Sequence, residues 1–225
     1  MSKKQKSDCE KSCIYCGSKE NMTVDHIPPK NLFPEPRPAD MLTVPCCKKC
    51  NESFSKDDEY FRTALVSHAS VCSDPNVQIV NEKLFRSVRR PEAAGLARAI
   101  YNSLRVVEIK SPGGICLGIS PVMVVSSDRI NRVINRIARG LFYIIHGYPI
   151  PSEYEVTCVY KDEAFSMPGE FIAPWERFWE QPVTIGENIF NYSYAICIDD
   201  PNGMLFVYWF YGKLWFYGYI MPKVN

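Results

Sequence analysis

A chain of 225 residues is long enough for one large domain or two small ones. Its 46% hydrophobic and 13% aromatic residues exclude a disordered protein, because that much apolar surface can form a core. No run approaches the roughly 20 apolar residues of a membrane-spanning helix, and the polar start of the chain lacks the apolar segment of a secretory signal. We therefore expect a cytoplasmic protein with no membrane association.

The net charge of +1 conceals an uneven distribution along the chain. Residues 83–139 carry 11 basic and three acidic side chains, a net charge of +8, whereas residues 140–225 carry a net charge of −6. A basic middle segment is typical of a surface that binds a polyanion such as nucleic acid. Pairing of opposite charges within the fold is an equally good explanation, and both stay open.

The N-terminal part predicts two strands followed by a helix. Met22–Ile27 and Met41–Val44 have the apolar and β-branched content of strands, and five prolines in the connection exclude a helix between them. The helix is expected to begin at about Cys47 or at Ser55. Ser55 has an acidic residue, Asp58, at the spacing of a capping box.

The middle of the chain, residues 83–146, is predicted to be largely helical. Apolar residues recur with helical spacing from Pro91 to about Ile109, and most regularly from Ser127 to His146. Short strands are expected between these helices, at Ile115–Ile119 and Val122–Val125.

The last third is predicted to form an antiparallel sheet within residues 153–221. Four of its segments are rich in β-branched and aromatic residues: Tyr154–Tyr160, Tyr194–Ile198, Met204–Tyr211 and Leu214–Ile220. The expected fold is therefore α+β, with a small head over residues 9–62 and a larger domain over residues 63–225. The aromatic sheet could also mediate self-association or bind a protein partner.

Six of the ten cysteines lie in the first 50 residues, where four of them form two CxxC pairs. Cys13 with Cys16 and Cys47 with Cys50 would supply four thiolates, the ligand set of a closed structural Zn²⁺ site with no position left for a catalytic water. Such an ion would contribute much of the folding energy of a small head. Cys46 could replace Cys47 as a ligand, but only Cys47 completes the CxxC spacing.

Between the two cysteine pairs lies the sequence VDHIPP, at residues 24–29. Together, CIYCG, VDHIPP and LTVPCCKKCN resemble the HNH endonucleases, the His-Me finger or ββα-metal nucleases, over about residues 13–61. The resemblance implies a zinc-stapled ββα fold. It also implies metal-dependent hydrolysis of phosphodiester bonds, with DNA as the expected substrate and binding partner.

The resemblance further implies a role for each residue of the site. His26 would be the general base that activates water, a task suited to an imidazole that is neutral at cellular pH. Asp25 and Asn51 would hold one catalytic divalent ion, Mg²⁺ or Mn²⁺, which stabilises charge in the transition state. The zinc would hold His26 and Asn51 at facing positions.

The chain departs from the HNH pattern at the middle asparagine. That position falls near Leu42, which has no polar group, so Asp40 or Asn31 would have to replace it. Asp57 and Asp58 are spare carboxylates, or simply helix-capping residues. The departure keeps two alternatives open: a non-catalytic zinc module that binds nucleic acid or protein on a degenerate HNH frame, and an RNA-cleaving toxin or defence effector.

Four arginines recur every three or four residues along the predicted Ser127–His146 helix: Arg129, Arg132, Arg136 and Arg139. Guanidinium groups in this register could follow a phosphate backbone, which makes the stripe a candidate nucleic-acid surface. A solvated face, or pairing with acidic side chains, is the alternative. The remaining histidines, His68 and His146, are expected to be satisfied locally and not to be catalytic.

Overall fold

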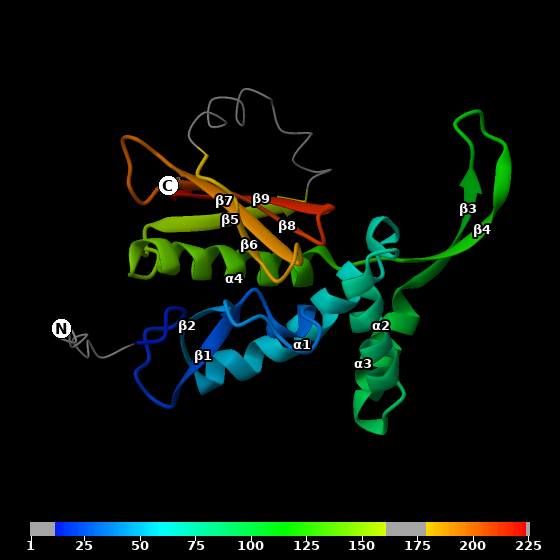
Figure 1. The fold of residues 1–225 in the computed structure, drawn as a ribbon, viewed down its shortest axis with the longest axis horizontal. Helices are drawn as coiled ribbons and strands as arrows, with labels where there is room; N and C mark the ends of the chain where they lie inside the picture. Colours follow the sequence, from blue (N-terminus) through cyan, green and yellow to red (C-terminus); the bar gives the residue numbers. More distant parts are fainter. Residues whose placement is uncertain (1–11, 161–178, 224–225) are drawn as a thin grey trace.

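The computed structural model describes residues 12–160 and 179–223 of the chain (Figure 1). It shows a ββα unit, a long helix, a five-stranded antiparallel sheet and a projecting two-stranded arm. The mixed α+β architecture and the antiparallel C-terminal sheet are as predicted from the sequence. Among the described residues, no helix is both long and apolar enough to cross a membrane.

The ββα unit consists of β1 (Met22–Ile27), β2 (Leu42–Cys47) and α1 (Lys48–Val66). The two strands pair antiparallel, and their connection contains a single 3₁₀ turn, η1 (Lys30–Leu32). The bounds predicted for the first strand are confirmed. The second strand reaches Cys47, which caps α1.

The capping box predicted at Ser55 is wrong, because Ser55 lies inside α1. Its hydroxyl donates a hydrogen bond to the backbone carbonyl of Glu52, one turn earlier in the helix. The helix instead begins at the second cysteine pair, so the cysteines and the helix start are parts of one local structure.

The middle of the chain differs most from the prediction. Between η2 (Ala69–Val71) and η3 (Pro91–Ala93) lies α2 (Pro75–Val88), which the sequence analysis missed. The sequence marks the start of α2 with Asp74, which directly precedes a proline at the first helical position. The carboxylate of Asp74 accepts hydrogen bonds from two backbone N–H groups of the first turn.

The helix predicted from Pro91 to Ile109 is too long. Helix α3 (Ala94–Ser103) ends where β-branched residues become frequent, and the chain continues as β3 (Leu104–Lys110). The two strands predicted beyond it are one strand, β4 (Cys116–Met123), and among the described strands it pairs only with β3. The pair β3–β4 forms the projecting arm (Figure 1).

Helix α4 (Ser127–His146) has the predicted bounds and ends at Gly147, whose φ of 80° suits glycine. The sheet that follows has the strand order β5-β9-β8-β7-β6. Its strands are β5 (Tyr154–Tyr160), β6 (Val183–Ile185), β7 (Phe190–Ile196), β8 (Met204–Phe210) and β9 (Leu214–Pro222). The short edge strand β6 was not predicted.

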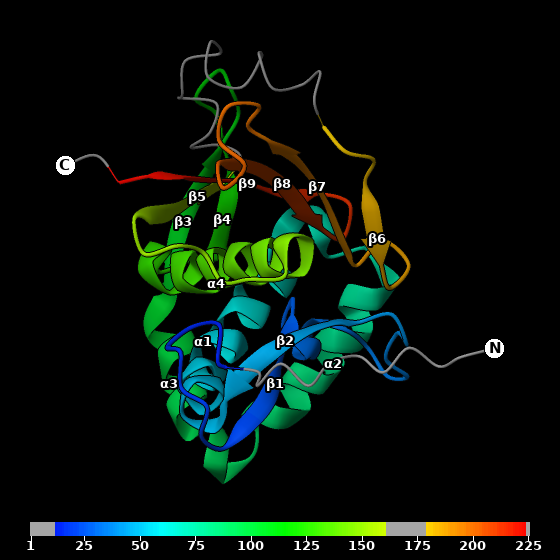
Figure 2. The same ribbon diagram turned by 90° about the vertical axis from the view of Figure 1, so that its left-hand side faces the viewer.

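Helix α4 lies between the sheet and the ββα unit (Figure 2). One hydrophobic core joins all three, with Ile27 of β1, Ile134 and Ile137 of α4 and Phe206 of β8 among its buried members. The domain boundary predicted at residue 62 falls inside α1, and the core continues across it.

Gly140 allows α4 to approach β1 closely. A Cβ atom at this position would overlap the side chain of Ile27, which is completely buried. The contact joins the strand that carries His26 to the helix that supports the C-terminal sheet.

We expect Gly140→Ala to lower the free energy of unfolding by about 1–3 kcal/mol, because the added methyl group overpacks this contact. Gly95→Ala is the matched control, since Gly95 is exposed on α3 and no atom lies near the position of its Cβ. That control should be neutral or slightly stabilising, because alanine favours a helix. Urea denaturation compares the two variants, and equal stabilities would contradict this account of Gly140.

Candidate functional site

Four cysteines converge at the junction between β2 and α1. The sulfur atoms of Cys13, Cys16, Cys47 and Cys50 all lie within 4.8 Å of one another, and the Sγ atoms of Cys16 and Cys47 are 3.6 Å apart. A tetrahedral zinc with Zn–S bonds of 2.3 Å places its sulfur ligands roughly 3.8 Å apart. The cluster can therefore hold a metal ion such as zinc, as predicted from the two CxxC pairs.

Local backbone geometry presents each pair of thiols. After the first pair, Gly17 takes a φ of 73° and its N–H bonds to the carbonyl of Cys13, which closes a tight turn. At the second pair, the Sγ of Cys47 accepts a hydrogen bond from the backbone N–H of Cys50. A backbone hydrogen bond from Ile14 to Pro45 joins the turn to β2.

The thiol environments distinguish the cluster from the adjacent Cys46. Burial opposes ionisation of Cys13, but hydrogen bonds with backbone groups, Cys47 foremost, outweigh it and lower the pKa of this thiol to about 7. Cys46 is completely buried outside the cluster, donates to the carbonyl of Cys47, and has a pKa raised by that burial. Cys47 is thus the member of the cluster, and Cys46 is a core residue.

His26 lies on β1 opposite Thr43 and is partly exposed. Partial burial lowers the pKa of its imidazole, and the positive charges of Lys30 and Arg37 lower it further against the opposing effect of Asp25. The ring is therefore a neutral proton acceptor at neutral pH, with two cationic side chains in its surroundings.

Asp25 does not lie where the sequence analysis placed it. Its side chain leaves the opposite face of the strand from His26, because consecutive residues of a strand alternate. It is 4% exposed, accepts a hydrogen bond of 2.7 Å from the hydroxyl of Tyr15, and lies 3.4 Å from Nε of Arg136. The carboxylate is committed to this buried pair and not to an accessible ion.

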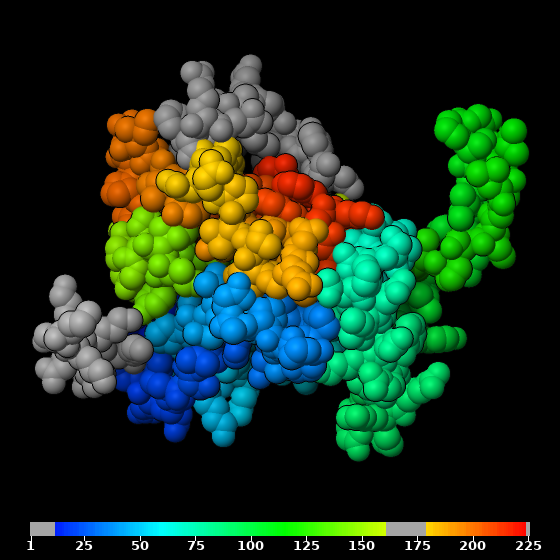
Figure 3. All heavy atoms as spheres, in the orientation of Figure 1, coloured from blue at the N-terminus to red at the C-terminus, as the bar shows by residue number. Residues whose placement is uncertain are grey.

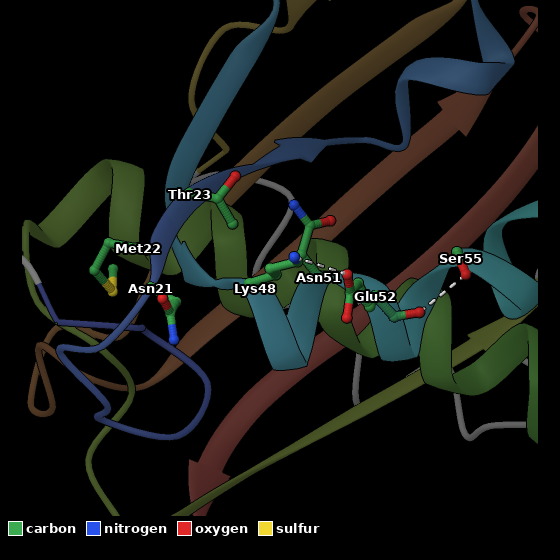
Figure 4. A pocket seen from close by; sticks show the side chains of 7 residues that line it. All are labelled: Asn21, Met22, Thr23, Lys48, Asn51, Glu52 and Ser55. Carbon is green, nitrogen blue, oxygen red and sulfur yellow. Dashed lines mark hydrogen bonds and ion pairs between the residues drawn. The ribbon is translucent and has the colours of Figure 1, made fainter.

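Asn51 lies in the first turn of α1, beside β1. Its amide nitrogen donates a hydrogen bond of 3.0 Å to the carbonyl oxygen of Val24. The same residue lines an open depression of about 640 Å³ whose other lining residues are Asn21, Met22, Thr23, Lys48, Glu52 and Ser55 (Figure 4).

Asp25 and Asn51 therefore do not converge on one position. Asp25 faces α4, whereas Asn51 faces the depression beside β1. The residues present do not fit a catalytic Mg²⁺ or Mn²⁺ held by this pair, which corrects that part of the sequence prediction.

Asn31, one of the two residues that could replace the missing middle asparagine, joins the turn after β1 to α1. Its amide nitrogen donates a hydrogen bond of 2.9 Å to the backbone carbonyl of Asp58 on α1. This contact fixes the start of the loop that follows His26. Asp40 is exposed and Leu42 is partly buried.

Three of the four arginines on α4 pair with the acidic residues of α1. Asp57 accepts hydrogen bonds of 2.7 Å from Nε of both Arg129 and Arg132. Arg136, whose side chain is 4% exposed, lies between Asp25 and Asp58. Arg136 is thus buried in its ion pairs, whereas Arg132 keeps a side chain that is 58% exposed beside Asp57. These arginines do pair with acidic side chains, as the alternative predicted. Their partners lie on α1 and β1 and not in the acidic C-terminal part of the chain.

Arg139 is exposed, and among the described residues it forms no ion pair.

Asp57 and Asp58 are interior residues of α1 and do not cap it. Hydrogen bonding to Arg132 and Arg129 lowers the pKa of Asp57, whereas burial raises the pKa of Asp58 to about 6 despite the attraction of Arg136.

The other two histidines are satisfied locally, as predicted. His68 is exposed and its Nδ1 accepts a hydrogen bond from the backbone N–H of Ser70. His146 lies at the end of α4 with its Nε2 3.0 Å from the sulfur of Met204, and its ring packs on Phe142.

Comparison of the chain with protein-family models, with curated proteins and with solved structures finds no match. Function is therefore inferred from the residues and geometry of the site. Its chemically distinctive features are the four-cysteine cluster and the partly exposed His26 on the adjoining strand.

We expect purified protein to contain one zinc ion per chain, measured by elemental analysis. Cys47→Ala should lose the ion, since a closed tetrahedral site needs all four sulfurs. Cys46→Ala is the matched control and should retain it, at the cost of a small cavity. Zinc retained in Cys47→Ala and lost in Cys46→Ala would show that the wrong neighbour has been assigned as the ligand.

Proposed function

We propose that this protein is an HNH-type nuclease that hydrolyses phosphodiester bonds, with DNA as its principal substrate and His26 as its general base. The observation that carries the proposal is the arrangement of the ββα unit. The four-cysteine cluster joins the hairpin to α1, and the hairpin carries an accessible, neutral imidazole on its first strand.

The surroundings of His26 suit a phosphate group. Lys30 is exposed four residues after it, and among the described residues no ion pair occupies its ammonium group. Arg37 is also exposed and is paired with Glu35 at 2.6 Å. Two cations near the imidazole attract a phosphodiester and disfavour protonation of the base.

The proposed step begins with a water molecule between His26 and the phosphorus atom. The neutral imidazole takes a proton from the water as its oxygen attacks phosphorus, and the bond from phosphorus to the 3′ oxygen breaks. The 3′ oxygen then takes up a proton from solvent, and the imidazolium returns its own proton to solvent. No protein ligand is assigned to a catalytic Mg²⁺ or Mn²⁺, because Asp25 is committed to Arg136.

Two observations favour a second candidate, a non-catalytic zinc module that binds nucleic acid on a degenerate HNH frame. Asp25 is buried against Arg136 and Tyr15, and Leu42 stands at the expected middle asparagine. Such a module would bind DNA without cutting it. An RNA-cleaving effector would use the same proposed base, so the cleavage assay must be run on both DNA and RNA.

We expect the wild-type protein to cut DNA in buffer containing Mg²⁺ or Mn²⁺, and His26→Ala to cut about a hundredfold to ten-thousandfold more slowly, the usual contribution of a general base. His68→Ala is the matched control, because it removes an exposed histidine outside the site. Cleavage of RNA alone would identify the effector alternative. Equal cutting by wild type and His26→Ala would remove His26 as the base, and binding without any cutting would favour the non-catalytic module.

The pH profile of kcat/KM tests the state of the base separately. Activity needs neutral His26, so it should fall as the pH drops through the pKa of this residue, with a midpoint below the ordinary 6.5. Lys30→Gln should move this acid limb to higher pH, because one of the charges that disfavour protonation is gone. Lys213→Gln, in an exposed turn of the sheet, should leave the limb unchanged. An unchanged limb in Lys30→Gln would contradict the proposed electrostatics.

A further inference from the structure

The basic middle segment, residues 83–139, contains both paired and unpaired cations. At its C-terminal end, Arg129, Arg132 and Arg136 of α4 pair with acidic side chains of α1 and β1. At its N-terminal end, the second half of α2 and the two residues that follow it carry four cations. We call these side chains the α2 patch: Lys83, Arg86, Arg89 and Arg90.

The three arginines of the α2 patch have no acidic partner among the described residues, and all four side chains are exposed. Lys83 is paired with Glu35, with 3.9 Å between its Nζ and a carboxylate oxygen. Glu82 is the one acidic residue between positions 82 and 90, so the patch keeps an excess of positive charge. Like charges gathered this closely repel one another, and a bound anion relieves that repulsion.

Two of these arginines line one open depression of about 610 Å³. Arg86 and Arg89 form it together with Glu82 and with the ring of Phe85, which is 64% exposed. The Nε of Arg86 donates to the backbone carbonyl of Glu82 at 3.4 Å, and its terminal nitrogens have no hydrogen-bond partner among the described residues. Guanidinium groups bind phosphate oxygens through pairs of N–H groups, so the depression fits a phosphate ligand.

The α2 patch is continuous with the surroundings of His26. Glu35, in the connection between β1 and β2, lies 2.6 Å from Arg37 and 3.9 Å from Lys83. Arg37 in turn is close enough to His26 to lower the pKa of its imidazole. Figure 3 shows this connection, in blue, against α2, in turquoise. A row of cations therefore leads from the candidate base along the second half of α2.

Acidic side chains border the first half of the same helix. Asp40 and Glu187, with Glu35, line a separate depression of about 500 Å³ that also includes Asn76 and Ile79 of α2. Carboxylates repel phosphate groups. A polyanion that reaches His26 is thus directed away from this depression and toward Arg86 and Arg89.

We propose that the α2 patch binds the phosphate backbone of DNA on one side of the bond that His26 cleaves. From Lys83 to Arg89 the helix and its cap extend about 9 Å, the axial length of about two to three nucleotides of one strand. The position relative to the cleaved bond rests on the proposed nuclease function. The contacts with DNA do not, and they can be measured without cleavage.

Fluorescence anisotropy with a labelled DNA duplex measures the affinity of the full chain at a series of salt concentrations, without added Mg²⁺ or Mn²⁺. Arg86→Gln should bind DNA more weakly than the wild type and should lower the slope of log K against log salt by about one, because one phosphate contact is lost. The addition of Arg89→Gln should lower the slope by about two in total. Lys213→Gln is the charge-matched control, in an exposed turn of the sheet, and should keep the wild-type slope.

Cleavage kinetics with Mg²⁺ or Mn²⁺ distinguish this proposal from the nuclease activity. Arg86→Gln should raise KM and leave kcat unchanged, because the contact lies away from the reacting atoms. Equal affinity and salt slope in Arg86→Gln and Lys213→Gln would overturn the DNA-binding role of the α2 patch, and so would a wild type that binds no DNA. Binding that depends on Arg86 without any cutting would support that role and contradict the proposed hydrolysis.

Discussion

The convergence of four sulfur atoms is the constraint from which the rest of the site follows. The first CxxC pair lies on a tight turn and the second lies where β2 becomes α1, so an ion shared by the two pairs would fix the hairpin against the start of the helix. The hydrogen bond from Asn51 to β1 uses the same junction. The strand that carries His26 is also held by Ile27, which is buried in the core shared with α4.

Charged side chains between α1 and α4 form a second group of contacts that holds the two helices together. Arg136 lies between Asp25 and Asp58, and its guanidinium also stacks over the ring of Phe54, 4.4 Å from the ring centre. Removing one partner of a buried ion pair leaves an uncompensated charge, so losing Asp25, Asp58 or Arg136 would cost more stability than the intact group adds. The pairing with Arg136 also keeps Asp25 from binding a catalytic metal ion, the role expected from its place next to His26 in the sequence.

Local signals in the sequence were sufficient for several elements. The spacing of the cysteines predicted the cluster, apolar and β-branched residues predicted β1, and a regular apolar stripe predicted α4 from Ser127 to His146. The orientation of Asp25 could not be predicted, because it depends on Arg136, more than 100 residues away in the chain. One signal for that pairing was present: Arg136 stands one helical turn from Val133 and from Gly140, at the border of the apolar stripe.

The prediction for the segment after α3 was wrong for a different reason. Leu104 continues the helical spacing of α3, yet β-branched residues are frequent from Val106 onward, and this segment pairs with β4 to form the exposed arm.

The site depends most on a metal ion shared by the four cysteines. X-ray absorption at the zinc edge of purified full-length protein tests it most directly. We expect four sulfur neighbours at about 2.3 Å; a coordination shell containing nitrogen or oxygen, or the absence of bound zinc, would contradict the account.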